Sequence, residues 1–273
     1  MIKAFLLGLV QGLTEFLPVS SSGHLVLAQK IMPGFETPGA VFEVVLHGGS
    51  LLAAIIYFRY DLFWFYKGLT GNKTIRDNRD ARSWISGIFI ATIPVGVAGL
   101  LAKNWIESLF DSPLVVSILL IFTGMILFIG EWFHKNRKKE NNESASVGLK
   151  AASCVGLAQT IALLPGISRS GVTMAAGLAF GWSRIKAARF SFMLMLPAVA
   201  GAVVLESHDV YKAVQEGGID SMVLLTGFIA SLIASYLAIR ILMNIIRKYS
   251  YKPFAIYCLG IGVLSIVLQL ILR

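Results

Sequence analysis

The chain has 273 residues, of which 56% are hydrophobic and only 14% are charged. Soluble domains carry about 25% charged residues, so this composition excludes an ordinary soluble enzyme or binding module. The formal net charge of +9 comes from lysines and arginines grouped between apolar runs, a pattern typical of membrane-protein loops rather than of a nucleic-acid-binding face. The two cysteines, Cys154 and Cys258, lie in apolar runs and indicate neither a disulfide framework nor a metal site.

The first apolar segment, Met1–Ile31, is interrupted by Pro18 and three serines, so neither half is long enough to cross a bilayer. Gln11 and Glu15 break the apolar stretch that a signal peptide would need, so the segment is interpreted as part of the mature fold. Irregular backbone at membrane depth must be buried in protein or line a wet cavity. Met1–Ile31 therefore predicts a re-entrant helical hairpin.

Six later segments each have about 20 mostly apolar residues and are predicted to span the membrane. They are Val41–Phe58, Trp84–Leu101, Pro113–Phe133, Ile185–Leu205, Met222–Met243 and Pro253–Leu272. Between the third and the fourth, Gly148–Phe180 is broken by Pro165 and Gly166 and predicts a second re-entrant hairpin. The expected fold is an all-α polytopic membrane protein with six spans and two re-entrant hairpins.

The positive residues indicate an orientation for these spans. Four connecting stretches hold 17 lysines and arginines, and three others hold only three. The rich stretches are Arg59–Arg82, Lys135–Lys150, Arg184–Arg189 and Arg247–Lys252, and the poor ones are Lys30–Ala40, Lys103–Asp111 and Glu206–Asp220. If the spans alternate and the second hairpin returns to the side it entered, all rich stretches share one face. The positive-inside rule makes that face cytoplasmic and both termini extracytoplasmic.

The two broken segments also resemble each other. Adding 148 to the residue numbers of the first hairpin aligns it with the second without a gap. The matched polar and small residues are Gln11 with Gln159, Ser20 with Ser168, Ser22 with Ser170, and Gly23 with Gly171. We interpret the chain as a single membrane domain, 1–273, made of two inverted repeats, 1–140 and 147–273. Inverted repeats with broken helices are a transporter architecture, and they bring two turns together near the midplane.

The first turn, Pro18–His24, carries groups suited to a phosphate substrate. Gln11 and Glu15 share a helix face, so they either hold a hard divalent cation with phosphate oxygens or tighten helix packing as a polar pair. The serines predict a helix start whose free N–H groups attract anions. A hydroxyl beside an imidazole and a carboxylate can act as nucleophile or can donate to a phosphate oxygen. Helix capping alone would account for the serines but not for His24 together with Glu15.

The second turn, Pro165–Thr173, contributes Arg169, the only basic residue between Ala151 and Trp182. A guanidinium in an apolar stretch needs a partner, which is either a bound anion or Glu15 in a structural ion pair. Glu43 and His47 share a face of the first span, where they either support the site or bond to a hairpin.

Three motifs resemble one known family. They are Gln11-x-x-x-Glu15, Pro18-Val-Ser-Ser-Ser-Gly-His24 and Pro165-Gly-Ile-Ser-Arg-Ser-Gly-Val-Thr173, and they resemble the undecaprenyl-diphosphate phosphatase family, also called the bacitracin-resistance family. The resemblance covers nearly the whole chain. It implies an enzyme of the bacterial plasma (inner) membrane that removes the terminal phosphate of undecaprenyl diphosphate and so recycles the carrier lipid of cell-wall synthesis. It also implies a divalent cation, Mg or Ca, and a site that opens on the extracytoplasmic side.

The same resemblance implies roles for individual residues. The catalytic positions are Glu15, Ser21, His24 and Arg169; the substrate-binding positions are Gln11, Ser20, Ser22, Gly23, Ser168, Ser170, Gly171 and Thr173; and the metal ligands are Glu15 and Gln11. Some relatives carry Glu at position 11, so an amide there predicts weaker metal binding. The alternative function is a transporter or flippase for an anionic or polyprenyl-phosphate substrate, because the inverted repeat also suits transport. A homo-oligomer is left open.

Overall fold

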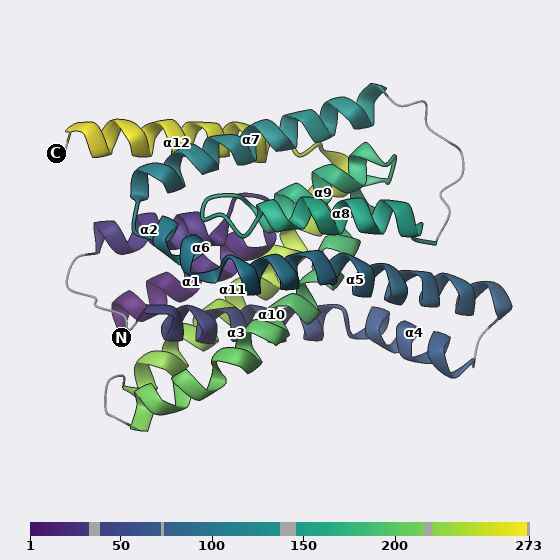
Figure 1. Ribbon diagram of the computed structural model, residues 1–273, viewed down its shortest axis with the longest axis horizontal. Coiled ribbons are helices and arrows are strands. Elements are labelled where there is room, and N and C mark those ends of the chain that lie inside the picture. Colours follow the sequence, from purple (N-terminus) through teal and green to yellow (C-terminus); the bar gives the residue numbers. More distant parts are fainter. Residues whose placement is uncertain (33–38, 72–73, 137–145, 216–219, 272–273) are drawn as a thin grey trace.

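The computed structural model describes residues 1–32, 39–71, 74–136, 146–215 and 220–271. These residues form twelve helices in an elongated bundle (Figure 1). The helices are α1 (Ile2–Phe16), α2 (Ser21–Ile31), α3 (Gly39–Tyr57), α4 (Arg59–Thr70), α5 (Ile75–Leu101), α6 (Lys103–Phe110), α7 (Pro113–Asn136), α8 (Leu149–Ile161), α9 (Arg169–Ala179), α10 (Arg184–Gln215), α11 (Ser221–Lys248) and α12 (Lys252–Ile271). The all-α class predicted from the sequence is confirmed.

Among the described residues, five helices are long and apolar enough to cross a membrane, namely α5, α7, α10, α11 and α12. A sixth span is present if α3 and α4 count as one, since this pair passes the same test but bends by 68° at its break. The sequence predicts six spans, and the helices give five or six.

Several helices extend beyond the apolar windows that predict them. The helix α10 continues past the predicted end at Leu205, and α5 begins before Trp84. Helical hydrogen bonding does not stop where hydropathy falls, and the Thr74 hydroxyl caps α5 by accepting from the Asp77 amide at 3.3 Å. The sequence analysis predicted neither α4 nor α6, because both are short and amphipathic.

Each broken segment forms two helices joined by a turn, α1 with α2 and α8 with α9. Leu17 precedes a proline, which disfavours helical backbone, and it takes an extended conformation with ψ of 140° that ends α1. Ser20 then has a positive φ of 71°, and Gly166 in the second turn has a φ of 101°. Neither φ value continues a right-handed helix, so the backbone changes direction at each of these two turns.

Small residues bring the first helix of each hairpin close to a spanning helix of the other half. The helix α1 packs against α11, and a Cβ added at Gly12 would lie 2.5 Å from the Ser231 carbonyl oxygen. The helix α8 packs against α5, where a Cβ at Gly156 would lie 2.5 Å from the Ala91 Cα. Close backbone approach of this kind is typical of helix packing in membranes.

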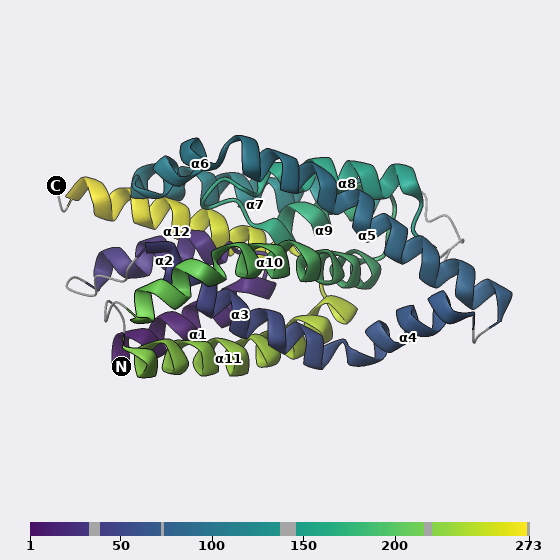
Figure 2. The ribbon, with the colours of Figure 1, turned by 60° about the horizontal axis from the view of Figure 1, so that its bottom comes forward.

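The outer surface of the bundle is apolar and its interior holds polar pairs. Phe122 of α7 and Leu270 of α12 are 47% and 62% exposed, as lipid contact requires. Inside, the buried hydroxyls of Ser50, Ser231 and Ser235 bond to one another at 2.9–3.0 Å. Figure 2 shows that the start of α1 and the end of α12 lie at one end of the long axis and α4 at the other. The chain is a multi-pass membrane protein.

Some sequence predictions fall outside the described residues. Parts of the connecting stretches used to assign orientation do so, at 33–38, 72–73, 137–145 and 216–219. The predicted end of the last span, Leu272, is also outside the described residues. The predicted boundary between the two repeats, at residues 140–147, is partly outside them.

Candidate active site

The turns of the two hairpins meet inside the bundle. In Figure 1, α2 and α9 extend to opposite sides of the centre. The Ser170 hydroxyl donates to the Leu17 carbonyl oxygen at 3.1 Å, which joins the second turn to the first. A Cβ at Gly23 would lie 3.1 Å from the Gly166 Cα, so the two backbones touch where neither has a side chain. Residues that are more than 140 positions apart in the sequence therefore share one buried region.

An ion pair links the two turns. Arg169 at the start of α9 donates from Nη2 to Glu15 Oε1 on α1 at 2.6 Å, and Glu15 is only 6% exposed. The other terminal nitrogen of Arg169 makes only a long contact of 3.5 Å with the Ser191 carbonyl oxygen. A buried carboxylate and guanidinium at this distance neutralise each other, and the loosely held nitrogen leaves part of the fork available to an anion.

The second oxygen of Glu15 accepts from two neutral side chains. The Ser21 hydroxyl donates to Oε2 at 2.5 Å, and Gln11 donates from its amide nitrogen at 2.9 Å. Glu15 is thus the group best placed to remove a proton from Ser21, because a general base must lie within hydrogen-bond reach of the proton that it takes.

His24 does not face this carboxylate. Its Nδ1 lies 2.8 Å from the Ser20 carbonyl oxygen and its Nε2 lies 2.8 Å from the Tyr257 hydroxyl. In the part of the chain that the structure describes, no hydrogen bond joins His24 to Ser21 or Glu15. The sequence places His24 within a turn of the serines, which is correct along the chain, but both ring nitrogens are engaged elsewhere.

The imidazole nearest to Glu15 belongs to His47 of α3, whose Nε2 lies 3.6 Å from Oε2. Its Nδ1 lies 2.8 Å from the Glu43 carbonyl oxygen one turn earlier, so the ring is held with Nε2 towards the site. The Glu43 carboxylate accepts from the Gln29 amide on α2 at 3.3 Å. Of the two alternatives for this pair, the bond to a hairpin is present for Glu43, and His47 lies beside the Glu15 carboxylate.

Most of the predicted substrate-binding residues shape the two helix starts. Ser20 and Ser168 cap α2 and α9 by accepting from the Gly23 and Gly171 amides at 3.2 and 3.0 Å. Their hydroxyls also lie 3.2 and 3.1 Å from those of Ser22 and Ser170, so the two turns are built alike. Thr173 is turned away, because its hydroxyl donates within the protein to the Ser191 hydroxyl at 2.7 Å.

The sequence analysis did not single out three residues that support the turns. Thr123 of α7 donates to the Gly166 carbonyl oxygen at 2.8 Å and accepts from the Ser168 amide at 2.9 Å. Ser191 of α10 accepts from Thr173, and Tyr257 of α12 pairs with His24. Thr123 and Ser191 are polar residues inside apolar spans, which was the one signal that could have found them, while Tyr257 resembles any interfacial tyrosine.

The sequence predicts a divalent cation held by Gln11 and Glu15, and the oxygen atoms of these two side chains are the ones to consider. Among the described residues, no group of three or more His, Cys, Asp or Glu side chains could hold a metal ion. However, the buried amide oxygen of Gln11 has no hydrogen-bond partner among the residues that the structure describes, and it belongs to the same side chain that contacts Glu15. One carboxylate and one amide oxygen suit a hard cation that takes its remaining ligands from water and phosphate.

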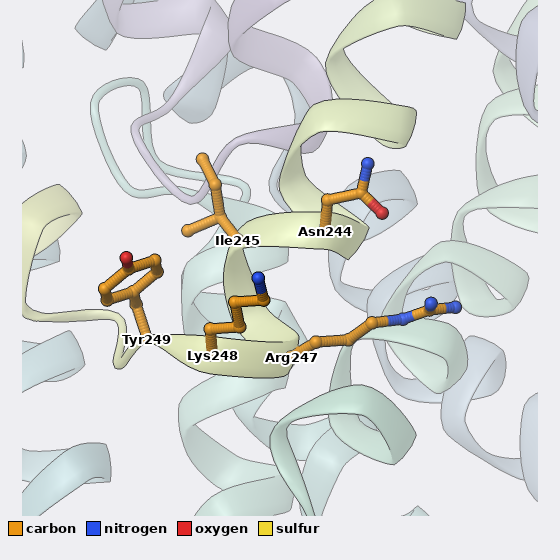
Figure 3. Close-up of a pocket in the computed structure, with 5 residues that line it drawn as sticks. All are labelled: Asn244, Ile245, Arg247, Lys248 and Tyr249. Atoms are coloured by element: carbon orange, nitrogen blue, oxygen red, sulfur yellow. The ribbon is translucent and has the colours of Figure 1, made fainter.

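A surface pocket lies elsewhere and has no part in this cluster. It has a volume of about 410 Å³ and is lined by Asn244, Ile245, Arg247, Lys248 and Tyr249 at the end of α11. Figure 3 shows that these side chains point in different directions and do not converge on a common centre. The buried cluster around Glu15 is therefore the candidate site.

Comparisons with known proteins agree along the length of the chain. A family model described as "Bacitracin resistance protein BacA" matches residues 4–264. The undecaprenyl-diphosphatase of Methanosphaera stadtmanae is 39% identical over 284 residues, which cover 99% of each chain. Those of Methanobrevibacter smithii and Elusimicrobium minutum are 40% and 37% identical, over 96% and 98% of this chain and 95% and 98% of their own lengths.

Proposed function

The chain belongs to the bacitracin resistance protein BacA family and is an undecaprenyl-diphosphatase, and we propose that the Glu15–Arg169 pair is the centre of its active site. The observation that carries the proposal is the 2.6 Å contact between these groups, because it joins two turns distant in sequence at one buried point. The substrate is undecaprenyl diphosphate, and the products are undecaprenyl phosphate and inorganic phosphate.

Arg169 and the two helix starts bind the diphosphate. The Arg169 nitrogen that makes only the long contact to Ser191 turns to a phosphoryl oxygen, while the other keeps Glu15 in place. The N-termini of α2 and α9 add partial positive charge, as helix N-termini do for phosphates. Phosphoryl transfer depends mainly on such positioning and charge stabilisation. Ser20, Ser22, Gly23, Ser168, Ser170 and Gly171 shape this anion site, with Gln11 beside it, and Thr173 supports the start of α9 through Ser191.

Ser21 is the nucleophile in this proposal and Glu15 is its base, since the hydroxyl already donates to the carboxylate at 2.5 Å. The Ser21 oxygen forms a bond to the terminal phosphorus, the bridging P–O bond breaks, and its electron pair leaves with undecaprenyl phosphate. The proton of Ser21 passes to Glu15. Water then releases inorganic phosphate, the proton on Glu15 returns to the serine oxygen, and His24 shuttles the proton that the water loses.

A divalent cation, Mg or Ca, belongs to the proposal as an aid to substrate binding. Gln11 and Glu15 would hold it, and it would neutralise charge on the diphosphate. The neutral amide at position 11 supports weak binding that depends on the substrate.

Two inverted repeats, 1–140 and 147–273, are also proposed. The helices α2 and α9 each have 11 residues and occupy positions offset by 148, as the sequence comparison predicts. The first helix of each proposed repeat packs on a helix of the other repeat, since α1 packs on α11 and α8 packs on α5. This arrangement would be expected if each half supplied one hairpin to a shared centre.

For the setting of the enzyme, we propose a bacterial plasma membrane with both termini and the site opening on the extracytoplasmic side. The start of α1 and the end of α12 lie at one end of the bundle, and α4 lies at the other (Figure 2). Because α4 belongs to the lysine- and arginine-rich stretch Arg59–Arg82, this placement supports the orientation.

The test is phosphate release from undecaprenyl diphosphate by purified protein in detergent, with and without a chelator. The wild-type protein should release phosphate, and Glu15→Gln should not, because an amide cannot take the proton of Ser21. Rapid quenching of a single turnover with labelled substrate should leave label on Ser21. Normal turnover by Glu15→Gln would refute the proposed centre, and label on His24 or on no residue would refute the serine nucleophile.

A further inference from the structure

The pairing of His24 with Tyr257 of α12 has no place in the reaction described above. The two rings are nearly parallel, with an interplanar angle of 8° and centroids 5.6 Å apart. The Tyr257 hydroxyl lies 2.8 Å from His24 Nε2, so the contact between the two rings is a hydrogen bond. Tyr257 comes from the last helix of the chain, far in sequence from the first turn that carries His24.

The partners of His24 determine which nitrogen holds its proton. Nδ1 lies 2.8 Å from the Ser20 carbonyl oxygen, which can only accept, so Nδ1 carries a hydrogen. In the neutral imidazole, Nε2 is then the acceptor and the Tyr257 hydroxyl donates to it. If the ring gains a second proton, Nε2 donates and the phenolic oxygen accepts. A hydroxyl can do both, so this one partner holds the ring in either protonation state.

The position of Tyr257 separates this histidine from the nucleophile. Ser21 donates to Glu15, and the Nε2 of His24 is covered by the phenol. The Tyr257 side chain is 46% exposed on α12, while Glu15 is 6% exposed. A proton exchanged at Nε2 therefore passes the phenolic oxygen and not the buried carboxylate.

We propose that Tyr257 is a positioning residue of the phosphatase reaction, which fixes the ring of His24 and shares the proton that His24 exchanges. The inference rests on the proposed function, since it assumes that His24 shuttles a proton during phosphate release. Tyr257 acts through His24, so removal of its hydroxyl alone should slow the chemical step and leave substrate binding unchanged.

The test compares Tyr257→Phe, which keeps the ring and removes the hydroxyl, with Tyr249→Phe on an exposed turn after α11. We expect kcat to fall about tenfold for Tyr257→Phe. A positioned acid–base group contributes about a hundredfold or more, and loss of the Tyr257 hydroxyl should remove only a part of the contribution of His24. KM and the unfolding temperature should not change, and Tyr249→Phe should match the wild type.

A second measurement reads His24 directly. The protein has four histidines, so nitrogen-15 NMR of histidine-labelled protein, with His24→Gln for assignment, resolves its ring nitrogens. The Nε2 resonance of His24 should shift in Tyr257→Phe, through loss of its hydrogen-bond donor, and stay in place in Tyr249→Phe. An unchanged resonance, or unchanged kcat, would overturn the role of Tyr257 while leaving Glu15 and Arg169 untouched. Full turnover by His24→Gln would instead refute the proposed proton shuttle.

Discussion

Arg169 pairs with the Glu15 carboxylate, and in the proposed function it also binds the diphosphate. Arg169→Ala would leave the negative charge of its buried partner Glu15 without a counter-charge. That variant would lose both stability and activity, so the two effects could not be separated. Arg169→Lys keeps the charge and removes the fork. We expect kcat to fall at least about a hundredfold with little change in unfolding temperature, because one oriented donor to a phosphoryl oxygen is lost.

Phosphate release and thermal unfolding of the purified Arg169→Lys protein check this prediction. Arg247→Lys at the exposed end of α11 is the control, since Arg247 lies outside the cluster. Wild-type turnover by Arg169→Lys would mean that a point charge is sufficient and that the fork has no role.

The serines of the first turn provide a matched comparison. Ser21 donates to Glu15, whereas the hydroxyl of Ser22 lies near only that of Ser20. Ser21→Ala should lower kcat about a thousandfold or more, as loss of a nucleophile does, and Ser22→Ala, which leaves the nucleophile and its base in place, should lower it far less. Steady-state phosphate release measures both. Equal effects of the two changes would indicate that the serines act together as a helix cap.

The sequence identified most of the groups in the site and two of their pairings, Gln11 with Glu15 and Arg169 with Glu15, but not the imidazole that faces Glu15. Glu15, Ser21 and Arg169 are recognisable because charged and hydroxyl side chains stand out in apolar segments and in their motifs. Which imidazole faces Glu15 depends on the direction of side chains on three different helices, so His47 could not be ranked above His24 from spacing. Tyr257 is more than 230 positions from His24, and no local pattern connects them.

At the scale of elements, the helix α1 reaches its place because Gly12 allows close contact with α11. A Cβ at Gly12 would lie 2.5 Å from the Ser231 carbonyl oxygen and 2.6 Å from the Ala234 Cβ. Gly12→Ala should therefore destabilise the protein by about 1–3 kcal/mol, as overpacking does, and displace Glu15. Thermal unfolding in detergent and phosphate release should both show the loss.

Gly96 of α5 is the matched control for this substitution. A Cβ there would meet no atom within 4 Å, so Gly96→Ala should change stability by less than about 0.5 kcal/mol. If Gly12→Ala were as stable and active as Gly96→Ala, α1 would not be packed against α11 as described.

The elements themselves were largely predictable from hydropathy and breaker residues. Prolines at positions 18 and 165 mark both hairpin turns, because a proline disfavours helical backbone before it. The helix α4 was missed because its apolar and polar residues alternate around the helix, which resembles a loop in a hydropathy window. Hydropathy and spacing also do not predict contacts between distant residues. For example, the Glu131 carboxylate accepts two hydrogen bonds from Arg184, which is 53 positions away.

At the scale of the whole molecule, the proposed orientation can be tested with single cysteines in a background without Cys154 and Cys258. Ile2 is 78% exposed near one end and Tyr66 of α4 is 62% exposed near the other. Ile2→Cys should react with a membrane-impermeant thiol reagent in intact cells, and Tyr66→Cys only after permeabilisation, because lysine- and arginine-rich loops stay inside. The reverse labelling pattern would place the site opening on the cytoplasmic side.

If the two hairpin turns meet to form one site, a cross-link can join them. A Cβ at Gly171 would lie 3.6 Å from the Pro18 Cβ, which is within the range that a disulfide bridges. In the cysteine-free background, Pro18→Cys with Gly171→Cys should form an intramolecular disulfide on mild oxidation. Pro18→Cys with Gly201→Cys should not, since no atom lies within 4 Å of a Cβ at Gly201. Failure of the first pair to cross-link in folded protein would contradict the shared site.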